Sequence, residues 1–175
     1  MQSPILAPTK QKRFPSIRPS NHRITSGETV GKKVTYNCVA WAANADTQIW
    51  WQAGDEPGCY WPSRVLGDDS LLSYEKLFEF LGYRQCDSDK LEIAYEKIAI
   101  YSNPDGFQHV AYQLFRGWTS KLGNWEDIWH KTLSTLEGGD YGTVWAIMKR
   151  RSGIRGYLAR ACFRLTAKLW PLPRP

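Results

Sequence analysis

The chain has 175 residues and a net charge of +6, which is enough length for one domain with its own core, and no apolar run in it is long enough to span a membrane. Nine Trp and nine Tyr favour a core or a groove built from large aromatic rings. Basic residues gather at the two ends while the middle of the chain is acidic, which excludes a uniformly basic nucleic-acid-binding domain.

Composition divides the chain into three regions. Residues 1–33 carry seven Lys or Arg and four prolines, so they predict an extended, mobile basic arm. Residues 34–150 hold the periodic apolar segments of a core domain. Residues 151–175 are basic, and the spacing within 153–169 predicts an amphipathic helix that docks on the protein itself or binds an anionic membrane or an acidic partner. No apolar leader precedes the arm, so we expect a cytoplasmic protein, or an effector secreted by a signal-independent route.

The first predicted helix begins at Cys38. Asn37 is a favourable N-cap residue, and the apolar residues after it in "NCVAWAA" indicate a short buried helix. Residues 46–69 predict an irregular loop, and its aromatic stretch "IWWQAGDEPGCYWP" (49–62) is either core or the wall of a substrate groove. An amphipathic helix follows from Ser73 to Leu81, and a glycine ends it.

Four strand-like segments and one more helix complete the predicted core. Residues 95–102 and 107–115 have the pattern of strands, with a turn between them. Residues 118–123 and 141–150 predict two further strands, and an apolar spacing typical of a helix covers 125–137. Helices followed by an antiparallel meander predict an α+β fold.

Cys38 and His109 are the residues that best fit a nucleophile and its base. A cysteine in the first turn of a helix meets unpaired N–H groups and the positive end of the helix dipole, which favour a thiolate. His109 lies on a predicted strand beside the small Ala111, so a helix packed on that face would bring sulfur and imidazole within about 4 Å. Each residue also has a purely structural interpretation, as a buried apolar cysteine or as a polar strand residue. His130 is expected on the surface of the 125–137 helix.

This pattern resembles the papain-like cysteine hydrolases, above all their compact bacterial branch of cell-wall endopeptidases and amidases. "YNCVAWA" is similar to the Cys-helix motif of that branch and "FQHVAYQL" to its His strand, while "WTSKLG" with "EDIWH" is similar to a segment found after the His strand in uncharacterised relatives. The resemblance covers residues 34–148. It implies a papain-like core, with a buried Cys helix packed on a small antiparallel sheet, Cys38 as the nucleophile and His109 as the base.

In that branch an Asn, Asp, His or Gln on the next strand orients the imidazole, and the resemblance points to Asn124 for this role. A turn centred on Arg116 and Gly117 would place Asn124 opposite His109. Other registers place a neighbour there instead: Lys121, Leu122 or Gly123. Asn124 is also a good N-cap for the predicted helix 125–137.

Substrate contacts are expected from the oxyanion hole and from five side chains. The backbone N–H of Cys38 should supply one oxyanion donor. The side chains expected to bind substrate are Tyr36, Asn37, Trp61, Ser120 and Lys121. Cysteine and histidine spacings match no zinc motif and no phosphate loop is present, so no metal or cofactor is expected. The cysteines are expected to be reduced, with a Cys59–Cys86 disulfide as an open alternative.

Two function classes follow from the sequence. The first is a thiol hydrolase that attacks a peptide or protein amide through a thioester, as a peptidase, an amidase, a protein deamidase or a toxin-like effector. The second is a non-catalytic interaction module on the same fold, which binds a protein, nucleic acid or an anionic membrane through aromatic and basic surfaces. Selective alkylation of Cys38 would favour the enzyme.

Overall fold

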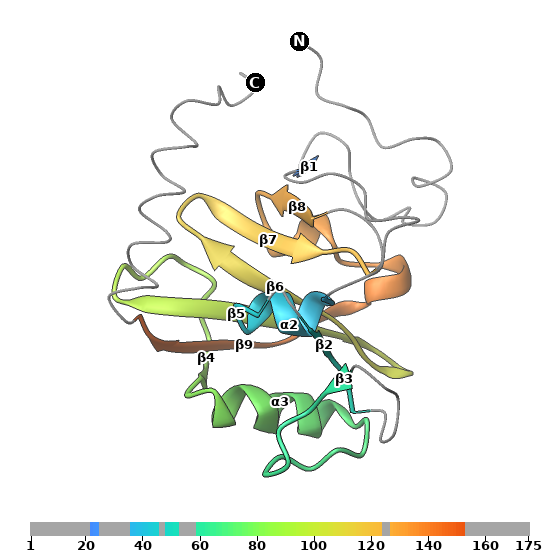
Figure 1. The fold of residues 1–175 in the computed structure, drawn as a ribbon. Coiled ribbons are helices and arrows are strands. Elements are labelled where there is room, and N and C mark those ends of the chain that lie inside the picture. Colours follow the sequence, from blue (N-terminus) through green and yellow to red (C-terminus); the bar gives the residue numbers. More distant parts are fainter. Residues whose placement is uncertain (1–21, 25–35, 46–47, 53–58, 124–126, 153–175) are drawn as a thin grey trace.

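A seven-stranded sheet organises the part of the chain that the structure describes, residues 22–24, 36–45, 48–52, 59–123 and 127–152 of a computed structural model (Figure 1). The strand order is β1-β8-β7-β6-β5-β9-β4, and every pairing is antiparallel. The strands are β1 (His22–Ile24), β4 (Arg84–Cys86), β5 (Tyr95–Asn103), β6 (Gly106–Leu114), β7 (Gly117–Lys121), β8 (Asp127–His130) and β9 (Thr143–Arg151). Helices and an antiparallel sheet together make an α+β fold, as the sequence predicts.

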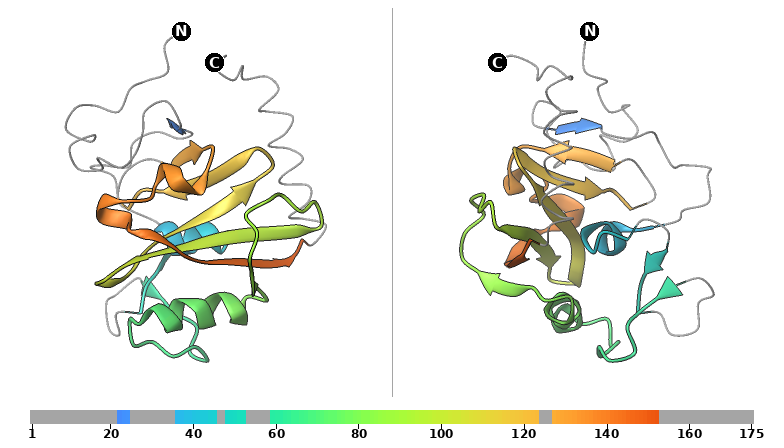
Figure 2. Two further views of the ribbon diagram at one scale, coloured as in Figure 1. Left: turned by 180° about the vertical axis from the view of Figure 1, so that it is seen from behind. Right: turned by 60° about the vertical axis from the view of Figure 1, so that its left-hand side comes forward.

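Two α-helices pack against this sheet. α2 (Cys38–Ala42) is capped by Asn37, and α3 (Leu71–Phe80) is capped by Ser70 and followed by Gly82, whose φ of 89° no other residue type adopts so readily. Both helices were predicted from the sequence. A small parallel pair, β2 (Ile49–Trp50) and β3 (Cys59–Tyr60), lies beside them within the predicted loop (Figure 2).

The alternation of side chains along β5 and β6 divides the core into two clusters, one on each face of the sheet. The first cluster joins α2 and α3 to Ile98, Ile100, Val110 and Tyr112. The second joins Ala99, Tyr101 and Ala111 to β7, β8 and the segment with the short 3-10 helices Leu133–Thr135 and Gly139–Tyr141. Consecutive residues of β6 therefore point into different clusters, as Val110 and Ala111 do.

The helix predicted over 125–137 is wrong. Asp127–His130 is strand β8, which pairs with both β7 and β1, and only Leu133–Thr135 forms a turn of 3-10 helix. The apolar residues at 128, 129, 133 and 136 have helical spacing by coincidence, since they divide between a strand and a turn. Long-range pairing with two neighbouring strands outweighs the local pattern here.

Two terminal expectations fall mainly outside the described residues. Of the basic arm, the structure describes only His22–Ile24, which pairs with β8. The amphipathic helix expected within 153–169 lies outside the described part of the chain. Among the described residues, no helix has the length and the apolar character that a membrane crossing requires.

Candidate functional site

Asn37 holds Cys38 at the start of α2 and ties that helix to β2. Its Oδ1 accepts the N–H of Ala40 at 3.0 Å and that of Trp50 at 3.2 Å, while its Nδ2 donates to the Trp50 carbonyl oxygen at 2.8 Å. The predicted N-cap is therefore confirmed. The same bonds occupy both ends of the amide, so Asn37 positions the helix and the aromatic segment and does not present its side chain to a substrate.

Backbone N–H groups surround the sulfur of Cys38. The N–H groups of Val110 on β6 and of Val39 and Cys38 itself all lower the pKa of the thiol, and the positive charge of Lys121 lowers it further. Burial acts more strongly in the opposite direction and raises that pKa to about 11, since only 8% of the residue is exposed. The expectation of a thiolate at neutral pH is wrong, because burial outweighs the N–H groups and the lysine charge that favour it.

His109 is buried in the second core cluster, with 1% of its surface exposed. Its ring centre lies 4.6 Å from that of Tyr141 and 5.8 Å from that of Tyr101. Burial, and then the charge of His130, lowers the pKa of the imidazole to about 3. Within the described part of the chain, its Nε2 has no hydrogen-bond partner, and the low pKa keeps the ring neutral at pH 7.

Cys38 and His109 approach β6 from different sides. α2 packs with Val110 and Tyr112, whereas His109 lies directly opposite Tyr101 and shares its face, so the expectation that the helix covers the His109 face is wrong. No hydrogen bond between the sulfur and the imidazole is found among the described residues. The sulfur nevertheless lies next to the backbone of His109, because the N–H that meets it belongs to the peptide bond joining His109 to Val110.

The register of β6 and β7 differs from the one that the sequence analysis used to place Asn124 opposite His109. Tyr112 pairs with Thr119 and Leu114 with Gly117, so the same register continued along the strands aligns His109 with Leu122 rather than with Asn124. The turn is centred one residue earlier than the sequence interpretation assumed. Asn124 itself lies outside the described residues.

Tyr36 and Lys121 meet where the start of α2 reaches β7. Lys121 is fully buried, and its Nζ lies 5.3 Å from the centre of the Tyr36 ring. The Tyr36 hydroxyl donates to Oδ2 of Asp127 at 2.6 Å, and Asp127 is the residue directly opposite Lys121 in β8. Two residues expected to bind substrate are thus brought beside Cys38, together with a carboxylate that sequence reasoning did not select.

Ser120 forms a hydrogen bond with His130 on the face of the sheet opposite to Cys38. If the Nδ1–H of His130 donates to the Thr132 carbonyl oxygen at 2.9 Å, its Nε2 accepts from the Ser120 hydroxyl, also at 2.9 Å. Both residues are fully buried. The expected surface position of His130 is wrong, because β8 is a strand whose alternation turns His130 inward, and the Ser120 hydroxyl expected to bind substrate is bonded to that imidazole.

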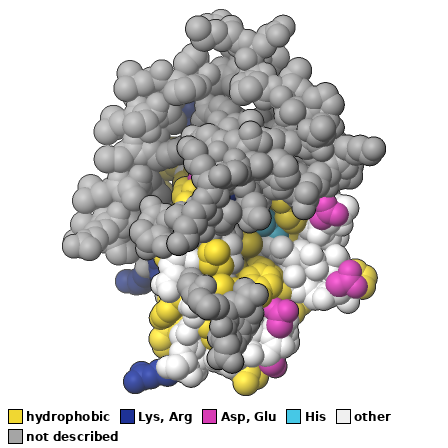
Figure 3. All heavy atoms as spheres, turned by 45° about the vertical axis from the view of Figure 1, so that its right-hand side comes forward, with side chains coloured by type: hydrophobic (Ala, Val, Ile, Leu, Met, Phe, Trp, Pro, Cys, Tyr) yellow, Lys and Arg dark blue, Asp and Glu magenta, His cyan; other side chains and the backbone are white. Residues whose placement is uncertain are grey.

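The described tryptophans of the stretch 49–62, which are Trp50, Trp51 and Trp61, pack against the core. Trp61 donates from Nε1 to the Val65 carbonyl oxygen at 3.2 Å, and its ring meets the ring of Tyr74 edge-on at 5.5 Å between centres. Tyr60 is 39% exposed over Trp50. Figure 3 shows hydrophobic side chains gathered on this face, in the region of β3 and α3. Trp61 is therefore a half-buried residue that packs against the core, and its neighbour Tyr60 reaches the surface.

One family model, described as a domain of unknown function, DUF7689, matches residues 25–149. The chain belongs to the DUF7689 family. No curated protein and no solved structure matches this DUF7689 domain significantly.

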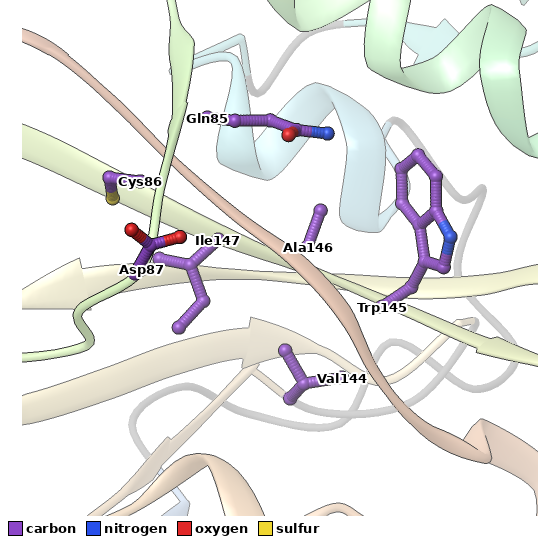
Figure 4. A pocket seen from close by; sticks show the side chains of 7 residues that line it. All are labelled: Gln85, Cys86, Asp87, Val144, Trp145, Ala146 and Ile147. Atoms are coloured by element: carbon purple, nitrogen blue, oxygen red, sulfur yellow. The ribbon is translucent and has the colours of Figure 1, made fainter.

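The DUF7689 domain has a groove of about 320 Å³ at the edge of its sheet, where β4 ends beside β9 (Figure 4). Its lining comes from 85–87 and 144–147, and neither Cys38 nor His109 is part of it. Cys86 in this groove and Cys59 are free thiols, so the alternative of a disulfide between them is excluded. Within the described residues, no group of three His, Cys, Asp or Glu side chains is arranged to hold a metal ion.

Proposed function

We propose that this DUF7689 domain is a cysteine-dependent amide hydrolase with a papain-like arrangement, acting on a peptide or protein amide. The observation that carries the proposal is the setting of the Cys38 sulfur. Three backbone N–H groups and the buried Lys121 all favour negative charge on that atom. A cysteine that only fills the core has no need of them, whereas a nucleophile that must lose a proton does.

In the proposed reaction, His109 accepts the thiol proton as the sulfur attacks the amide carbonyl carbon. This step requires the imidazole, which packs against Tyr141 on the other face of the sheet, to turn toward the edge of β6 where the Val110 N–H meets the sulfur. The amine then leaves with the proton that His109 holds, and a thioester joins the acyl group to Cys38. Water hydrolyses the thioester, with His109 as the base again.

Because both groups are neutral at pH 7, the proposal requires the thiol proton to pass to His109 during the attack, and it does not use a thiolate–imidazolium pair formed in advance. At neutral pH a thiol with a pKa of about 11 keeps its proton, and an imidazole with a pKa of about 3 is a weak base, so the proposal also requires substrate binding to raise the pKa of His109. The backbone N–H of Cys38, at the start of α2, supports the proposal as a donor to the oxyanion of the tetrahedral intermediate.

A peptidyl vinyl sulfone tests the proposal, because it reacts with a cysteine that a neighbouring base activates. We expect saturable labelling of Cys38 in the full-length protein, mapped by mass spectrometry. His109→Ala should abolish this labelling while Cys59 and Cys86 still react slowly. His130→Gln is the comparison variant, since it changes another buried histidine, which is bonded to Ser120; it removes only a charge that lowers the pKa of His109, so labelling of Cys38 should persist.

Two outcomes would contradict the proposal. One is that Cys38 reacts no faster than the half-buried Cys59. The other is that His109→Ala, still folded by circular dichroism, labels at the wild-type rate. Hydrolysis of model amides by Cys38→Ala at the wild-type rate would contradict it equally.

A non-catalytic interaction module is the second candidate. Two observations favour it: no hydrogen bond joins Cys38 to His109 among the described residues, and burial holds both groups neutral. For this candidate, vinyl sulfone labelling of Cys38 should be no faster than that of the other thiols. Replacement of Cys38 should then change stability and leave binding of a partner intact.

A further inference from the structure

Strand β9 has an open edge beside the groove. One edge of β9 pairs with β5 from Tyr95 to Ser102, whereas its other edge is covered by β4 only at residues 147–149. Within the described part of the chain, residues 143–146 have no strand neighbour on that side. An edge of this kind presents backbone N–H and C=O groups with which a further strand can pair.

The groove occupies the place where β4 would continue. β4 ends at Cys86, opposite Ile147, and the same register would place the next residue opposite Ala146. The chain leaves the sheet instead, and the carbonyl oxygen of Ser88 accepts from the ammonium of Lys97 at 2.6 Å. The groove of about 320 Å³ therefore lies in line with β4 and along the open edge of β9, and this volume is at the lower end of the range for ligand pockets.

A tryptophan turns toward this groove because of a β-bulge. The consecutive β5 residues Ile100 and Tyr101 pair with Ala146 and Val144, so Trp145 is an extra residue without a partner in β5. A bulge re-aims a side chain at a sheet edge, and the indole of Trp145 lines the groove while the residue is 40% exposed. Exposed tryptophans are the residues that most often anchor a bound peptide or protein.

The groove is acidic. Asp87 is the charged residue of its lining, and the N–H of Val144 donates to Oε1 of Glu137 at 3.2 Å, which brings a second carboxylate to the same edge. Figure 4 shows the Asp87 carboxylate and the Trp145 ring at the two sides of the groove. A carboxylate and an indole face both attract a cation, so the groove suits a basic side chain. A second copy of the domain would bring the same carboxylates, and like charges oppose such pairing.

We propose that the outer edge of β9, residues 143–146, binds an extended peptide segment of a partner protein that carries a basic side chain. The segment adds to the sheet antiparallel to β9 and in line with β4, and its backbone pairs with the open edge. Its basic side chain lies between Asp87 and the ring of Trp145. This interaction does not depend on the role of Cys38, because neither Cys38 nor His109 lines the groove.

A peptide titration tests the proposal on the full-length protein labelled with nitrogen-15. The probe is a peptide of about six residues with blocked ends, which alternates valine and threonine around a central lysine. We expect saturable shifts of the backbone amide signals of Trp145 and Ala146. A peptide with glutamate in place of the lysine should bind about tenfold more weakly or worse, and N-methylation of alternate backbone nitrogens should abolish the shifts.

Two substitutions in the groove have matched controls elsewhere on the surface. Trp145→Ala should weaken binding of the lysine peptide by about tenfold, whereas Tyr60→Ala, which removes a ring that is 39% exposed on β3, should leave it unchanged. Asp87→Lys should remove the preference for lysine over glutamate. Asp105→Lys, which changes an exposed acid in the turn between β5 and β6, should keep that preference.

Several results would overturn the proposal. They are an absence of shifts in 143–146 at about 1 mM peptide, equal binding of the lysine and glutamate peptides, and an equal loss of binding in Trp145→Ala and Tyr60→Ala. Self-association of the protein that Trp145→Ala abolishes would make a second copy the occupant and would overturn it as well. The comparison of the three peptides needs no variant of the protein, so it holds even if Trp145→Ala does not fold.

Discussion

Acidification from about pH 7 to pH 5 should destabilise this domain through His109. Its pKa is about 3 in the folded protein and 6.5 in the reference state, because burial disfavours the charged imidazole. The unfolded chain therefore binds the proton more readily. For a histidine whose folded pKa is lowered, the stabilising contribution is complete above the unfolded pKa and is lost as the pH falls toward the folded one.

The size of the effect follows from these two values. Between about pH 7 and pH 5, a histidine with a pKa of 6.5 in the unfolded chain becomes almost fully protonated while the folded one stays neutral, which removes about 2 kcal/mol from the free energy of unfolding. Any pKa of His109 below about 4 in the folded protein gives nearly the same loss of stability. Between about pH 7 and pH 5 only the unfolded chain takes up the proton, so the pKa in the unfolded chain determines the size of the loss.

Urea unfolding followed by tryptophan fluorescence would measure the loss at both pH values. The comparison is with His109→Phe, which keeps an aromatic ring between Tyr101 and Tyr141 and cannot be protonated. We expect the wild type to lose about 2 kcal/mol more than His109→Phe between the two pH values. Equal losses in the two proteins would refute the assignment of a neutral, buried His109.

Three further substitutions test local features of the fold by the same unfolding assay. Asn37→Ala should cost about 1–2 kcal/mol, because it removes both the helix cap and the tie to β2, and a loss below about 0.5 kcal/mol would show that these bonds are not formed. Ser120→Ala should cost about 1–3 kcal/mol by leaving Nε2 of His130 without its donor, and the loss should shrink when His130 is already replaced by Phe. Gly142→Ala should cost about 2 kcal/mol or more, since its φ is 70° and a Cβ would lie 2.0 Å from a β5 carbonyl oxygen, whereas Gly67→Ala, with no contact nearer than 3.6 Å, should be close to neutral.

The features that could be predicted from the sequence are those that depend on neighbouring residues. The cap at Asn37, the amphipathic α3 and the alternating strands β5 and β6 all have short-range patterns with one physical interpretation. The segment 125–137 has no such single interpretation. Its apolar spacing fits a helix as well as a strand followed by a turn, and only pairing with β7 and β1 decides between them.

In the candidate site, too, the features that depend on long-range packing could not be predicted from the sequence. Cys38 was identified from its own neighbours, and the structure surrounds its sulfur with N–H groups. The sequence does not predict which face of β6 is covered by α2, because both faces are buried. A shift of one residue along the strand exchanges the face of Val110 for the face of His109. The β-bulge at Ser102, which shifts the pairing with Phe107 and His109, is another non-local feature without a sequence signature.

The order of the two pKa values determines how the proposed pair would have to work. A thiolate–imidazolium pair forms before substrate binds only when the thiol pKa lies below that of the imidazole, and here burial places them at about 11 and about 3. Charge on Cys38 therefore has to develop together with the new carbon–sulfur bond, at the moment when Lys121 and the three N–H groups stabilise it most. A substrate that moved the ring of Tyr141 away from His109 would bring polar groups to the imidazole and raise its pKa, so that binding itself would prepare the base. In this interpretation the burial that keeps both groups neutral is compatible with catalysis, because it also keeps the thiol unreactive until an amide is in place.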